Sequence, residues 1–171
     1  GAYDAAARFD RKIAGWSPPL QSADRDLIPA KATIDARARD MGRNDAYVQS
    51  GETIHKDGIV GALYMLNARP SHKVLGMDET WATEFQEEVE TLFTLYAESP
   101  MNWVDAARQL DFTGLIRLGV GISVFSGECL ATAEWKRERG REFSTAIQMI
   151  DPDRLSTPST LAYNENIRAG I

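Results

Sequence analysis

Residues 78–99, "DETWATEFQEEVETLFTLYAES", constrain the fold most, because they have the periodicity of an amphipathic helix. Asp78 stands where an N-cap is expected, and Glu79 suits the positive end of the helix dipole. At roughly 100° per residue, the large apolar side chains share one face. They are Trp81, Phe85, Val89, Leu92, Phe93 and Tyr96. The opposite face carries Glu84, Glu87, Glu88 and Glu90. The chain must therefore fold so that the apolar face packs against other elements.

The segments after this helix predict an α+β fold. A second amphipathic helix should begin after Asp111 and end at Gly127. "CLATAEW" and "FSTAIQMI" predict two strands joined by the charged turn "KRERGRE", a β-hairpin leading into a small antiparallel sheet. The apolar run "GIVGALYML", residues 58–66, predicts a buried strand, and "NIRAGI" at the end resembles the start of another.

The N-terminal part predicts two regions with a boundary near residue 32. Residues 1–32 should be an arm and a proline-rich strap, because Pro18, Pro19 and Pro29 forbid a continuous helix or central strand. Residues 33–171 should form the main domain, which opens with N-terminal helices. Thr33 is a plausible N-cap for the first helix, and Asp45 for the second. The second helix should direct Tyr47, Val48, Gly51 and Ile54 toward the core.

Composition limits the functional classes. The 171 residues are 43% hydrophobic and 26% charged, as in a soluble globular protein. The net charge is −6, and it derives from residues 78–98, which hold seven acids and no Lys or Arg; the rest has 19 basic and 18 acidic residues. No apolar run approaches the roughly 20 residues of a membrane span. The single Cys129 excludes an internal disulfide, and its apolar neighbours favour a small core residue.

The stretch "IDARARDMGRND", residues 34–45, places three arginines among three aspartates. The arginines are Arg37, Arg39 and Arg43, and the aspartates are Asp35, Asp40 and Asp45. Because its net charge is zero, the stretch lacks the uncompensated positive face that DNA binding requires. Asp40 and Arg43 can pair at i, i+3. We expect an ion-paired surface or a subunit contact in preference to DNA contact.

No residue pattern makes a strong case for catalysis. Glu84 and Glu88 are one helical turn apart and could seat a hard cation, but a solvated face explains them more simply. Glu52 and His55 match a di-metal spacing only once, where two matches are needed. The glycines of "GVGISVFSG" fail the dinucleotide fingerprint and are better explained as points where another element approaches closely. "KRERGRE" is a locally positive tip that could touch a phosphate, or simply a soluble turn. No catalytic, cofactor or metal residue is assigned.

Several segments, taken in order, resemble the lambda-type family of bacteriophage portal proteins. They are "GWSPP", "ARARDMGRNDAYVQSGETIHKDGIVG", "ARPSHKVLGMDE", the amphipathic helix, "GVGISVFSGECLATAEW", "IQMIDPDRLSTP" and "NIRAGI". Each piece is weak alone, but the ordered set extends from about residue 15 to the last residue and is specific.

This resemblance implies a structural protein of the virion, present in the host cytoplasm during assembly. Portals of the family form a ring, typically of twelve subunits, at one capsid vertex. Terminase and head-completion proteins dock on the ring, and DNA passes through its channel during packaging and ejection. The resemblance implies no enzyme activity, cofactor or membrane. The chain would be the N-terminal part of the portal wing, truncated at its C-terminal end.

Within that wing, a subunit interface could include Arg37, Arg39, Arg43, Glu84 and Glu88. Two alternatives stay open at this point. One is a non-enzymatic binding or scaffolding domain unrelated to phage, and the other is a small hydrolase or metal enzyme built on Glu52, His55 and the acidic helix.

Overall fold

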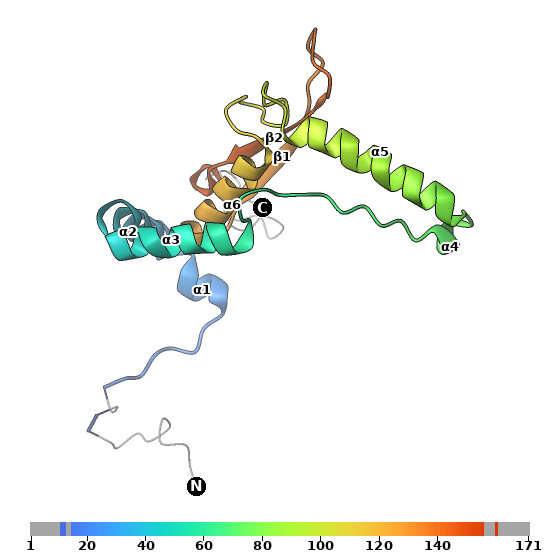
Figure 1. Cartoon of the computed structure of the whole chain (residues 1–171). Helices are drawn as coiled ribbons and strands as arrows, with labels where there is room; N and C mark the ends of the chain where they lie inside the picture. The colour runs from blue at the N-terminus through green and yellow to red at the C-terminus, as the bar shows by residue number, and fades with distance from the viewer. Residues whose placement is uncertain (1–10, 13–14, 156–159, 161–171) are drawn as a thin grey trace. The chain divides into compact units, whose positions relative to one another are not determined.

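The computed structural model describes residues 11–12, 15–155 and 160 (Figure 1). The chain divides into two units, Gly1–Ile34 and Asp35–Ile171. In the first unit, residues 15–22 are all exposed, and α1 (Ala23–Leu27) is a short helix within the region predicted as arm and strap. The predicted final strand "NIRAGI" lies outside the described residues. Within the described part, none of the helices combines the length and apolar character needed to cross a membrane.

Two helices open the second region, α2 (Lys31–Asn44) and α3 (Ala46–Ile59). The predicted break between them is confirmed: the Asp45 carboxylate accepts hydrogen bonds from the backbone N–H groups of Tyr47, at 2.8 Å, and Val48, at 3.2 Å. The predicted cap at Thr33 is wrong, because α2 begins two residues earlier and Thr33 lies inside it. The prediction that Tyr47 and Ile54 point to the core is also wrong, since they are 91% and 66% exposed.

Residues 61–71 contradict the predicted buried strand. After the buried Val60, the chain turns at Gly61, whose φ is +73°, and continues in an extended form that pairs with no strand among the described residues. Its backbone is held by side chains instead. The Tyr64 N–H donates to Thr113 Oγ1 at 3.0 Å, and the Ala68 N–H donates to Glu90 Oε1 at 2.9 Å. The apolar composition could not show that, within the described part, this segment is bonded by side chains and does not pair with a strand.

The two predicted amphipathic helices are confirmed. After the short α4 (His72–Leu75), α5 (Glu79–Ala97) begins at Asp78, whose Oδ1 accepts from the Trp81 N–H at 2.7 Å. The helix α6 (Phe112–Ser126) begins at Asp111, whose Oδ1 accepts from the Gly114 N–H at 2.6 Å. It ends at Gly127 with a φ of +71°, a left-handed conformation that glycine adopts without a Cβ clash.

The predicted hairpin is formed by β1 (Leu130–Trp135) and β2 (Thr145–Ile150), paired antiparallel from Leu130 opposite Ile150 to Trp135 opposite Thr145. The α+β fold class is thereby confirmed. Ile147 in β2 also accepts from the Ala106 N–H at 2.9 Å and donates to the Val104 carbonyl at 2.7 Å, so the loop before α6 lies along the other edge of β2.

Close contacts at glycines position α6, as the sequence predicted. A Cβ on Gly119 would lie 2.9 Å from the Met149 side chain of β2. A Cβ on Gly121 would lie 2.6 Å from the Lys56 side chain of α3. The small residues therefore allow a strand and a helix to approach α6 closely.

The core of the described part is small. The buried apolar residues are Val60, Ala97, Trp103, Val104, Leu115 and Ala146. Cys129 is not among them: it is exposed, so its prediction as a core residue is wrong. It lies three residues after the end of α6, and its Sγ would be 3.4 Å from a Cβ built on Gly119. Partial desolvation raises the pKa of the thiol.

Candidate subunit interface

Of the three arginines predicted on α2, Arg39 is engaged within the chain. Its guanidinium contacts Asp151 Oδ1 at 2.9 Å and Asp153 Oδ2 at 2.5 Å, beyond the end of β2. The backbone N–H of Asp153 also donates to the Asp151 carboxylate. This hydrogen bond is the main cause of a lowered pKa at Asp151, and the Arg39 contact lowers that pKa further. Arg39 therefore fastens α2 to the end of the hairpin. Sequence reasoning missed this pair, because its partners are separated by 112 residues.

Arg37 and Arg43 face solvent instead. Arg37 is exposed, and the Arg43 side chain makes the predicted pair with Asp40, a long contact of 3.7 Å. Both side chains of that pair are about two-thirds exposed, so the pair contributes little to stability. These two arginines keep their charge available to a partner, whereas Arg39 does not.

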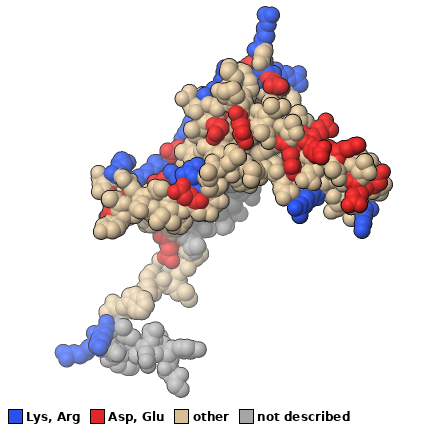
Figure 2. Space-filling view, in the orientation of Figure 1, with Lys and Arg blue, Asp and Glu red and all other residues tan. Residues whose placement is uncertain are grey.

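The acidic face of α5 is visible in Figure 2, where Asp and Glu side chains gather along that helix. Glu84, Glu87 and Glu88 are exposed, as predicted. Glu90 was wrongly placed with them. It is half-buried, and its Oε1 accepts from the Ala68 N–H and from Gln86 Nε2, at 2.9 and 2.8 Å. Glu90 therefore ties the extended segment 61–71 to α5.

The residues of the alternative metal enzyme have other roles here. Glu52 forms an ion pair with Lys56, one turn along α3. His55 Nδ1 lies 2.8 Å from the Gly51 carbonyl oxygen in the same helix. Among the described residues, no group of three or more His, Cys, Asp and Glu side chains is placed to hold a metal ion.

The positive tip of the hairpin is partly folded back into the protein. The Arg141 side chain is only 1% exposed and donates to the carbonyl oxygens of Trp103 and Phe143. Its guanidinium also lies 5.1 Å from the centre of the Trp103 ring. Arg141 is thus a structural residue of the loop, and the sequence carried no local signal for this, because its neighbours in the turn are charged.

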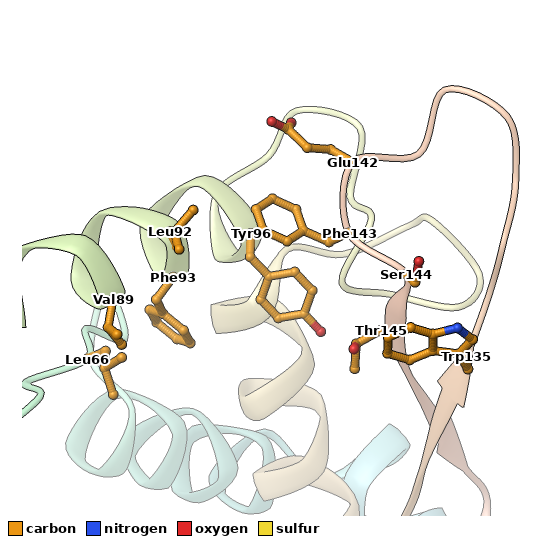
Figure 3. A pocket seen from close by; sticks show the side chains of 10 residues that line it. All are labelled: Leu66, Val89, Leu92, Phe93, Tyr96, Trp135, Glu142, Phe143, Ser144 and Thr145. Atoms are coloured by element: carbon orange, nitrogen blue, oxygen red, sulfur yellow. The ribbon is translucent and has the colours of Figure 1, made fainter. Parts of the chain in front are cut away.

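An apolar groove of about 570 Å³ lies between α5 and the hairpin (Figure 3). It is lined by Leu66, Val89, Leu92, Phe93, Tyr96, Trp135, Glu142, Phe143, Ser144 and Thr145. The rings of Tyr96 and Phe143 meet edge to face with centres 5.4 Å apart. Burial raises the pKa of Tyr96, against the opposing effect of the Arg141 charge. The sequence predicted the helix and the hairpin but not the groove, which exists only where they meet.

Residues 9–171 match the sequence model of a family described as phage portal protein, lambda family. The chain belongs to this family. Two curated relatives align with all of it: the portal protein of Escherichia phage N15, at 36% identity, and portal protein B of Escherichia phage lambda, at 35%. In both alignments the chain covers 32% of the relative, so it spans about a third of their length. The family assignment removes the alternative of a scaffolding domain unrelated to phage.

This portal chain leaves a band of large apolar side chains exposed between residues 59 and 77. They are Ile59, Leu63, Tyr64, Met65, Leu66, Val74, Leu75 and Met77. Large apolar side chains left exposed at this density are candidates for cover by another protein segment. Together with the exposed charges of α2 and α5, it defines the candidate subunit interface.

Proposed function

We propose that the chain is part of a structural subunit of the portal ring at one capsid vertex of a tailed phage. Residues 33–171 would belong to the wing, and residues 1–32 would form an arm and strap that contact an adjacent subunit. The observation that carries the proposal is the match of residues 9–171 to the lambda family of phage portal proteins. In a ring, a neighbouring subunit would cover the exposed apolar band and contact the exposed charges of α2 and α5.

The proposed interface changes the predicted set in one respect. Arg37 and Arg43 on α2, and Glu84 and Glu88 on α5, are exposed and are the proposed contacts with neighbouring subunits. Arg39 would act indirectly, by holding α2 against Asp151 and Asp153. Opposite charges brought together between subunits fix register and suppress wrong pairings more than they add affinity.

The role proposed for the assembled protein is mechanical and non-enzymatic. DNA would pass through the channel of the ring during packaging and ejection, without sequence-specific contacts by this part of the subunit. The net charge of −6 and the pairing of Arg39 and Arg141 within the chain agree with that role. Terminase, capsid and head-completion proteins would dock on the ring, in the host cytoplasm during assembly and then in the virion.

The test is to purify the complete product of the reading frame that encodes the chain and image it by electron microscopy. We expect a ring with a central channel, and a mass by native mass spectrometry that corresponds to about twelve subunits. A product that stays monomeric across a wide concentration range, or that forms particles without a channel, would contradict the proposal.

A further inference from the structure

The proline-rich strap and the apolar groove have matching chemistry. In "GWSPPL", residues 15–20, Trp16 is 67% exposed and Leu20 is fully exposed. Pro18 and Pro19 favour the polyproline II conformation, which presents side chains along an extended rod at little further entropic cost. Such segments bind in grooves lined by aromatic side chains. The groove between α5 and the hairpin offers Phe93, Tyr96, Phe143 and Trp135, the last of which is 66% exposed.

The charges beside the two surfaces are complementary. Arg11 precedes Trp16 by five residues, so it can lie at most roughly 18 Å from Trp16, the reach of a fully extended chain. On α5, Glu84 and Glu88 precede the groove residue Leu92 by two turns and one turn, along a row that leads from the acidic face to the edge of the apolar face, and Glu84 lies roughly 12 Å from Leu92 along the axis. Glu142 lines the groove on the hairpin side. A strap with Trp16 in the groove could therefore direct Arg11 toward the exposed acids of α5.

From these observations we infer that the groove binds the strap of a second copy of this chain. Trp16 and Leu20 insert among the groove aromatics, and Arg11 lies along the acidic face of α5. Residues 15–22 are all exposed, and the groove is open to solvent. The inference deepens the proposed function, in which neighbouring subunits meet, by naming the two segments that join them.

Peptide binding tests the two surfaces without requiring a ring. A fluorescein-labelled peptide of residues 8–22 is titrated into the 171-residue chain carrying Trp16→Ala and Leu20→Ala, and fluorescence anisotropy is measured. We expect saturable binding, at least about tenfold weaker when the peptide itself carries both substitutions. The affinity should also fall as salt rises, because Arg11 faces acids.

A matched pair of receptor variants locates the binding site. Leu92→Lys puts a charge into the groove and should weaken the peptide by about tenfold or more. Leu95→Lys is on the same helix, and Leu95 is 52% exposed against 47% for Leu92, but it does not line the groove, so it should leave binding within about twofold. Equal melting temperatures would show that both variants fold. No binding, or equal loss in both variants, overturns the inference.

Cross-linking decides whether the strap comes from a second copy. A photoreactive phenylalanine at position 16 is placed in light and 15N-labelled chains, which are mixed and irradiated. We expect cross-links that join a light to a heavy peptide, ending in residues 92–96 or 143–145. Links only within one isotope would show that the strap binds its own chain and would overturn the inference. Peptide binding without ring formation would support this inference and contradict the proposed function. Ring formation by the complete gene product without peptide binding would support the proposed function and contradict this inference.

Discussion

Gly42 shows how much a single missing side chain matters in this fold. The glycine lies in α2, and a Cβ built on it would stand 2.7 and 2.8 Å from two ring atoms of Phe125 in α6. A rigid aromatic ring cannot bend away as the end of a lysine can, so the ring or the helix must shift. Gly51 in α3 offers a control, because a Cβ there would meet nothing within 4 Å.

The same substitution should therefore have opposite effects at the two sites. Gly51→Ala should stabilise the chain by about 0.5–1 kcal/mol, through the higher helix propensity of alanine. Gly42→Ala should destabilise it by about 1–2 kcal/mol, because overpacking exceeds the same gain in propensity. Urea unfolding followed by circular dichroism measures both free energies of unfolding. If the two variants were equally stable, α2 would not pack on Phe125 as described.

At the scale of elements, side chains accept backbone hydrogen bonds along residues 61–71. Glu90 is the residue that tests this, because its carboxylate accepts the Ala68 N–H. Glu90→Ala should leave this N–H without its acceptor and destabilise the segment locally by about 1–2 kcal/mol. Hydrogen exchange at Ala68 should then become about tenfold faster, while exchange in α6 stays unchanged.

Glu87→Ala is the control for this change, since Glu87 is an exposed acid on the same helix. It removes the same charge and adds the same alanine, so it should leave exchange at Ala68 as it is in the unchanged chain. Faster exchange at Ala68 in both variants would mean that the segment responds to the charge or stability of α5, and that the Glu90 hydrogen bond does not hold it.

These elements also show what the sequence can predict. The caps at Asp45, Asp78 and Asp111 were predictable, because a cap depends on residues within one helical turn. The hairpin was predictable because its two strands are neighbours in the sequence, joined by residues 136–144. The largely exposed course of "GIVGALYML", which was predicted to be a buried strand, was not predictable, because strand formation needs a partner that the periodicity of one segment cannot reveal.

The candidate interface was predictable only in part, because charge pairing over a long separation leaves no local pattern. The exposed charges of α5 followed from helical periodicity, yet the same periodicity misplaced Glu90, whose partner is a backbone N–H in another segment. Arg39 looked equivalent to Arg37 and Arg43 in the sequence. Only the fold brings it to Asp151 and Asp153, and only the fold creates the groove.

At the scale of the whole molecule, the division among the α2 arginines makes the proposed association testable. Arg37 and Arg43 are exposed, so Arg37→Glu with Arg43→Glu should leave the melting temperature nearly unchanged. The double variant should nevertheless weaken subunit association by about tenfold or more, because it reverses two charges of the proposed interface. The unchanged protein should associate less tightly as salt rises, since salt screens contacts between exposed charges.

Arg39→Glu should behave in the opposite way and is the matched comparison. It would set a third carboxylate against Asp151 and Asp153 and remove the contact between α2 and the hairpin, at a cost of roughly 1 kcal/mol in the free energy of unfolding. Thermal unfolding measures this loss, and sedimentation velocity of the complete gene product measures association for both variants. If Arg39→Glu impaired association without changing stability, or the double variant unfolded the chain, the assignment of these arginines to separate roles would be wrong.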